Sequence, residues 1–157
     1  MIFILQRNYC SYKMVKGIKK NNLKIVEMSF LAKLEIDNQI FNVLKFDITL
    51  EQGTNNNGKP SNKTKGGQIK LIVESTQTDL FSDWMVSHTS VKDGKIIFYR
   101  RDAMSTMKNV TFENAYCIYL RKKFCSEGIS PMTTKILITS NKIKIGNTLF
   151  ENNWKPS

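Results

Sequence analysis

Apolar and polar residues alternate with a period of two along most of the chain from Phe30 onward. Because successive side chains of a strand point to opposite faces, this alternation predicts strands with one buried face. The first two predicted strands are 30–36 and 40–50, joined by a tight turn at Asp37-Asn38. Further strands are predicted at 69–74, 95–101, 110–112, 115–124, 134–140, 142–145 and 148–150.

Two dipeptides predict further turns between these strands. Asp93-Gly94 precedes the strand predicted at 95–101, and Gly146-Asn147 lies between the last two apolar runs. Glycine with asparagine or aspartate supplies the positive φ angles that tight hairpin turns require.

One segment has helical spacing instead. Thr76 or Thr78 can cap this helix, and Asp79 suits its first turn. Four apolar residues fall at i, i+1, i+4 and i+5 on one face: Leu80, Phe81, Trp84 and Met85. A helix of about ten residues does not persist alone in water, so we expect this face to pack on the sheet that the strands form rather than to bind a ligand.

Seven to nine short strands with one helix predict a mainly β fold, either a small antiparallel β-barrel or a closed sandwich with one short flanking α-helix. The 157 residues suit one domain. Residues 1–27 have no sustained period and carry an excess of basic residues. We expect them to be a basic extension that is disordered or absent from the natural protein, with Met28 as the natural start and the domain at 28–157.

Residues 51–67, EQGTNNNGKPSNKTKGG, interrupt the strand pattern. The segment is rich in Asn, Gly, Lys, Ser and Thr, and none of these residue types can build a core. Loops of this length in a compact domain are usually functional or disordered.

The formal net charge of +11 is the unusual bulk property of the chain. Such a charge can serve nucleic-acid binding, because basic residues release the counterions of phosphates. In residues 28–157, however, 18 basic and 12 acidic residues are scattered, which favours a solvated surface. Aromatic residues next to basic ones at 98–101 and 116–123 leave a barrel that binds single-stranded nucleic acid as the alternative.

The motifs of catalysis, metal binding and membrane insertion are missing from the sequence. The one histidine, His88, follows the helix, and neither GxSxG nor GxxxxGK[ST] occurs. No ligand-like spacing of His, Cys and carboxylates is present, and Asp79 and Asp83 fit the wet side of the helix. We therefore predict no enzyme, catalytic residue, metal or cofactor. No apolar run is long enough to cross a bilayer, and no signal-peptide pattern occurs.

Several short blocks, in order along residues 28–156, resemble the Hcp (TssD) tube proteins of the type VI secretion system. The blocks are MSFLAKLEID from Met28, GGQI and VEST within 66–76, DWM at 83–85, KDGKI and YRRDAM within 92–104, AYC at 115–117, PM at 131–132 and ENNW at 151–154. The resemblance implies a small β-barrel with one flanking helix.

The resemblance further implies homohexameric rings that stack into a hollow tube inside a contractile sheath. The tube would be expelled with a VgrG-like spike and effector proteins, so the protein would be cytoplasmic before firing and then secreted without a signal peptide. Nucleic acid is not an expected partner. Extended loops in this family bridge neighbouring subunits or rings, which implies eight interface residues here: Asn55, Asn56, Asn57, Gly58, Lys59, Pro60, Lys63 and Lys65.

Overall fold

The computed structural model describes residues 30–100, 105–126, 132–152 and 154. The extension predicted over residues 1–27 lies outside this part of the chain. The elements in chain order are β1 (Phe30–Ile36), β2 (Gln39–Glu51), β3 (Lys65–Glu74), α1 (Leu80–Val86), β4 (Lys92–Arg100), β5 (Thr106–Phe124), β6 (Met132–Ile145) and β7 (Thr148–Glu151).

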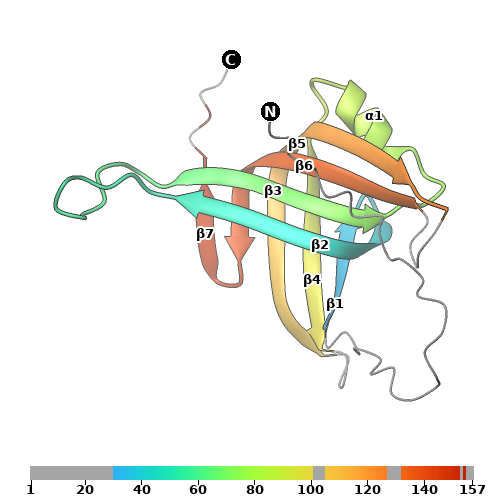
Figure 1. Ribbon diagram of the computed structural model, residues 1–157, viewed down its shortest axis with the longest axis horizontal. Coiled ribbons are helices and arrows are strands. Elements are labelled where there is room, and N and C mark those ends of the chain that lie inside the picture. The colour runs from blue at the N-terminus through green and yellow to red at the C-terminus, as the bar shows by residue number, and fades with distance from the viewer. Residues whose placement is uncertain (1–29, 101–104, 127–131, 153, 155–157) are drawn as a thin grey trace, which may run out of the picture.

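The strands form one antiparallel sheet in the order β3-β2-β1-β4-β5-β6-β7, and an additional pairing between β3 and β6 closes the sheet on itself. Figure 1 shows the result: β2, β3 and β6 run side by side, and β1 and β4 stand more upright. β7 pairs with the last four residues of β6. The mainly β, barrel-like fold predicted from the sequence is thereby confirmed.

The turn at Asp37-Asn38 forms as predicted. Both residues have positive φ angles, 48° and 59°, and the flanking Ile36 and Gln39 are paired. Positive φ at both central residues fits the right-handed twist of the two strands, which is why Asp and Asn are suited to this position. The predicted turn at Gly146-Asn147 likewise separates β6 from β7.

The predicted turn at Asp93-Gly94 was wrong, because both residues lie inside β4. Gly94 is paired with Phe112 of β5, and a Cβ atom at Gly94 would lie 2.3 Å from the tip of that phenyl ring. The glycine therefore makes room for a buried ring of the neighbouring strand. The Asp93-Gly94 dipeptide looks like a turn in the sequence, but here the glycine is required by packing inside the sheet.

The short strands predicted at 110–112 and 115–124 are one strand, β5, and those predicted at 134–140 and 142–145 are one strand, β6. Asn114, with a φ of 50°, lies where the alternation of β5 changes phase between buried Phe112 and buried Ala115. A local irregularity of this kind interrupts the period of two without ending the strand.

The core fills the inside of the closed sheet, where the side chains of every second residue along the strands pack together. On β3 these are Ile69, Leu71 and Val73, and on β6 they are Ile136 and Ile138. All five are inaccessible to solvent. The strand alternation seen in the sequence thus corresponds to the inside and the outside of the barrel.

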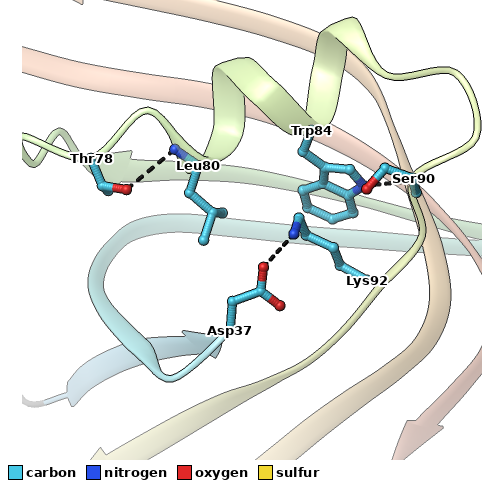
Figure 2. A network of polar contacts seen from close by, with 6 residues as sticks. All are labelled: Asp37, Thr78, Leu80, Trp84, Ser90 and Lys92. Carbon is cyan, nitrogen blue, oxygen red and sulfur yellow. Dashed lines mark hydrogen bonds and ion pairs between the residues drawn. The ribbon is translucent and has the colours of Figure 1, made fainter.

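Helix α1 packs against this core with its apolar face. Leu80, Phe81 and Trp84 are buried, Met85 is half-buried against the same cluster, and the ring centroids of Phe81 and Phe41 lie 4.6 Å apart. Figure 2 shows Trp84 beneath the helix, where its indole N–H donates a hydrogen bond of 3.1 Å to the carbonyl oxygen of Ser90.

The start of α1 and the barrel below it are fixed by two polar contacts. The N-cap residue is Asp79, whose side chain makes no capping hydrogen bond, so the predicted caps Thr76 and Thr78 were wrong. The hydroxyl oxygen of Thr78, one residue before the N-cap, accepts a hydrogen bond of 3.2 Å from the backbone N–H of Leu80. Lys92 of β4 forms an ion pair with Asp37 in the β1–β2 turn (Figure 2). The helix has seven residues, fewer than the sequence pattern suggests.

Candidate functional site

The β2–β3 connection projects from the barrel as an arm, which we define as residues 51–65 (Figure 1). The sequence predicts a functional or disordered loop over 51–67, but β2 and β3 extend into it, and a few backbone contacts connect the two sides of the segment between them. Thr54 and Pro60 form an antiparallel bridge, and the Ser61 N–H donates to the Gly53 carbonyl at 2.8 Å. The arm is therefore a β-hairpin.

The tip of the arm is held by one side chain. The amide oxygen of Asn55 accepts hydrogen bonds from the backbone N–H groups of Asn57 at 3.1 Å and Lys59 at 3.0 Å. Gly58 adopts a φ of 76°, and its N–H donates to the Asn55 carbonyl at 2.9 Å. An asparagine that bonds to the backbone a few residues ahead is a standard way to close a turn.

The eight residues implied as an interface all lie on this arm and are all exposed: Asn55, Asn56, Asn57, Gly58, Lys59, Pro60, Lys63 and Lys65. Residues 52–64 contain two lysines and no acidic residue. The arm thus presents an ordered backbone, amide side chains and positive charge to solvent.

The root of the arm is fastened to the barrel by Asn152, just after β7. Its side-chain N–H group donates to the carbonyl oxygens of Ser140 at 2.8 Å and Gly66 at 3.3 Å. A Cβ atom at Gly67, where φ is 86°, would lie 2.1 Å from that nitrogen. No pattern in the sequence indicates this contact, because Asn152 and Gly66 are 86 positions apart.

Removing the Asn152 amide should loosen this joint. Asn152→Ala should lower the free energy of unfolding by about 1–3 kcal/mol, because two side-chain hydrogen bonds are lost. Gly67→Ala should also destabilise, and its cost should be smaller in the Asn152→Ala background, where the clash with the amide is gone. Urea unfolding of the four proteins measures this coupling. Asn56→Ala, at the exposed tip, is the control and should change stability by less than about 0.5 kcal/mol; equal effects at both sites would contradict the assignment.

The groups considered for chemistry are dispersed in the part of the chain that the structure describes. His88 is exposed, and no group of three or more His, Cys, Asp or Glu side chains there could hold a metal ion. Burial raises the pKa of the Cys117 thiol, which donates a hydrogen bond to the Tyr119 carbonyl at 3.6 Å. A buried thiol of this kind stays protonated and packs as a small apolar group. None of the described helices is long and apolar enough to span a membrane.

Comparison with known proteins identifies the family. The model for hemolysin coregulated protein Hcp (TssD) matches residues 28–155. The structure of Hcp1 from Flavobacterium johnsoniae superposes with a TM-score of 0.74 at 33% sequence identity, over 78% of this chain and 99% of that one. The chain belongs to the Hcp (TssD) family.

More distant structures share the Hcp fold. Hcp1 from Salmonella typhimurium superposes with a TM-score of 0.62 at 11% identity, covering 74% of this chain and 85% of that one. A type VI secretion system effector from Yersinia pestis gives 0.60 at 8% identity, covering 77% and 99%. A comparison with curated proteins found no match. As a member of the Hcp family, the protein is a structural subunit of the type VI secretion tube.

Proposed function

We propose that this tube subunit assembles as homohexameric rings that stack, and that the β2–β3 arm makes contacts between copies. The observation that carries the proposal is the arm itself: residues 51–63 are all exposed, yet internal hydrogen bonds order them up to the tip. Holding an exposed hairpin in one shape lowers the entropy lost when it binds. A preorganised arm is suited to reach a neighbouring copy.

The composition of the arm favours a wet, polar contact over an apolar one. Asn55, Asn56 and Asn57 offer amide donors and acceptors, and Lys59 and Lys63 bring positive charge. Such groups contribute to the specificity and rate of association more than to affinity. The same contact repeated around a closed ring multiplies a small free energy by the number of subunits.

We further propose that the protein works through these surfaces and without catalysis, as one domain over residues 28–157. Its partners would be other copies of itself, a sheath, a VgrG-like spike and effector proteins. It would reside in the cytoplasm before firing and then leave the cell through the type VI apparatus without a signal peptide. The family membership supports each of these assignments.

The alternative function, binding of single-stranded nucleic acid, has less support from the side chains. Stacking on bases requires open aromatic faces. Phe98 packs edge-on against Phe46 with ring centroids 5.2 Å apart, and Tyr116 contacts Trp154 at 5.7 Å. Phe98 and Tyr116, two of the four aromatic residues in the aromatic-basic runs, are therefore already in contact with other rings.

Native mass spectrometry and electron microscopy test the ring. Both the full chain and residues 28–157 should give a species of six subunits and ring-shaped particles. Rings from the shorter chain alone would indicate that residues 1–27 obstruct assembly. A protein that stays strictly monomeric in both forms at high concentration would overturn the proposal.

A further inference from the structure

Basic residues that are scattered in the sequence come together on the outside of the barrel. The pairing register places Lys45 of β2, Ile72 of β3, Lys135 of β6 and Arg121 of β5 in one row across four strands. The next row on the same face of the sheet contains Lys70 in one direction along the strands. In the other direction, the next row on that face contains Lys123. We call Lys45, Lys70, Arg121, Lys123 and Lys135 the basic face.

These side chains point outward because their neighbours along each strand point inward. On β6, half-buried Lys135 and Leu137 alternate with Ile136 and Ile138, which are fully buried. The other four basic side chains are exposed. Strands β2, β3 and β6 therefore present this outer surface as one continuous sheet (Figure 1).

The acidic groups on the same surface do not balance the five basic ones. Asp47 lies 3.8 Å from Lys70, and both are well exposed. Glu74 is the second acidic side chain of this surface, and among its contacts it accepts a hydrogen bond of 2.8 Å from Asn42. Beyond them, Glu51 and Lys65 face each other across β2 and β3, where their charges cancel. A net positive charge remains over the centre of the sheet.

Much of the acidic charge gathers elsewhere on the barrel. Glu35, Asp37, Asp93 and Glu113 line an open hollow at the β1–β2 turn, together with the single basic residue Lys95. This separation gives the basic face a potential that adjacent carboxylates do not cancel, and such a potential attracts an oppositely charged partner.

The aromatic groups of the face indicate which kind of anion fits. The Lys135 ammonium lies 5.6 Å from the ring centroid of Tyr119, and the Tyr116 ring contacts Trp154. These contacts leave less open ring surface for stacking by bases. Between the cations lie Ile72 and Leu137, both half-buried, which can contact the aliphatic parts of a polypeptide.

We propose that the basic face docks an acidic polypeptide segment of another protein, whose carboxylates pair with Lys135, Arg121 and their neighbours while its aliphatic groups contact Ile72 and Leu137. The site goes beyond the arm-mediated contacts proposed above and does not require that six copies close a ring. Because the charges are exposed, the binding should weaken as salt is added.

The test uses the full chain with poly-L-glutamate as the acidic probe and an oligo(dT) strand as the competing one. The variant Arg121→Gln/Lys135→Gln removes two cross-strand neighbours of the basic face. The matched control is Lys95→Gln/Lys144→Gln, since these two lysines flank Thr111 in a row across β4, β5 and β6. Urea midpoints verify that both variants are folded, and native masses report their assembly.

The face variant should lose at least about tenfold in affinity for poly-L-glutamate and keep the native mass of the parent protein. The control variant should lose less than about twofold. Equal losses would overturn the proposal, because binding would then follow net charge alone. It would also fall if oligo(dT) bound more tightly through the same residues, or if the face variant changed the assembly mass, which would make the face a contact between copies. If the parent protein formed no rings but the face variant still lost affinity for poly-L-glutamate, the proposal of hexameric rings would be refuted. The proposed docking site would remain supported.

Discussion

Shortening the β2–β3 arm is expected to prevent ring and tube assembly while the barrel stays folded. The change replaces residues 54–60 by Asn-Gly, a two-residue turn that connects Gly53 to Ser61, which are already hydrogen-bonded. Because every replaced residue is exposed, the free energy of unfolding should change by less than about 0.5 kcal/mol. The hexamer fraction in native mass spectrometry should fall at least about tenfold, which corresponds to a loss of about 1.4 kcal/mol in the overall free energy of assembly.

Charge variants at the arm distinguish a specific contact from a general effect of shortening. Lys59→Glu/Lys63→Glu reverses the charge of the arm, whereas Lys59→Arg/Lys63→Arg keeps the charge and changes the head groups. The reversed pair should assemble poorly, and the arginine pair should assemble much as the parent does. Normal rings from the shortened arm would contradict the proposed role of residues 55–60, and normal rings from the charge-reversed pair would contradict that of Lys59 and Lys63.

Replacing Trp84 by alanine is expected to give the largest loss of stability of any single change considered. Trp84 is 1% exposed and lies between helix α1 and the core. Truncating a buried tryptophan costs about 3–5 kcal/mol through lost apolar burial and the remaining cavity. A domain of this size is stable by about 5–15 kcal/mol, so the variant should be partly unfolded at moderate urea concentrations.

Val86 supplies the control for this prediction within the same helix. Its side chain is 85% exposed, so Val86→Ala should change the free energy of unfolding by less than about 0.5 kcal/mol. Urea unfolding followed by circular dichroism measures both variants. A Trp84→Ala protein as stable as Val86→Ala would show that the helix does not depend on its apolar face for packing.

Much of the fold follows from patterns of short range. The alternation over 30–36 and 40–50 predicts β1 and β2, and Asp37-Asn38 predicts the turn between them because few residue pairs accept positive φ. The apolar stripe from Leu80 to Met85 predicts the helix and the face that it buries. Each of these signals lies within about ten residues, which is the range over which periodicity acts.

The candidate surfaces required contacts of longer range. The composition of residues 51–67 indicates a functional loop but not a hairpin, because its order depends on the Asn55 side chain bonding to particular backbone groups. Asn152 has no sequence signal that connects it with the root of the arm. The scattered lysines indicate only a solvated surface, since strand register alone determines which of them become neighbours.

The sequence by itself therefore determined the mainly β class, the helix, two of the turns and, through its resemblance to the Hcp (TssD) family, a role in the secretion tube. Only the tertiary structure decided that Gly94 accommodates Phe112, that the arm is an ordered hairpin fastened by Asn152, and that Lys135 and Arg121 are neighbours. The physical reason is that side-chain period is a local property of the chain. Register and closure, in contrast, are set by pairing between strands that are far apart in sequence.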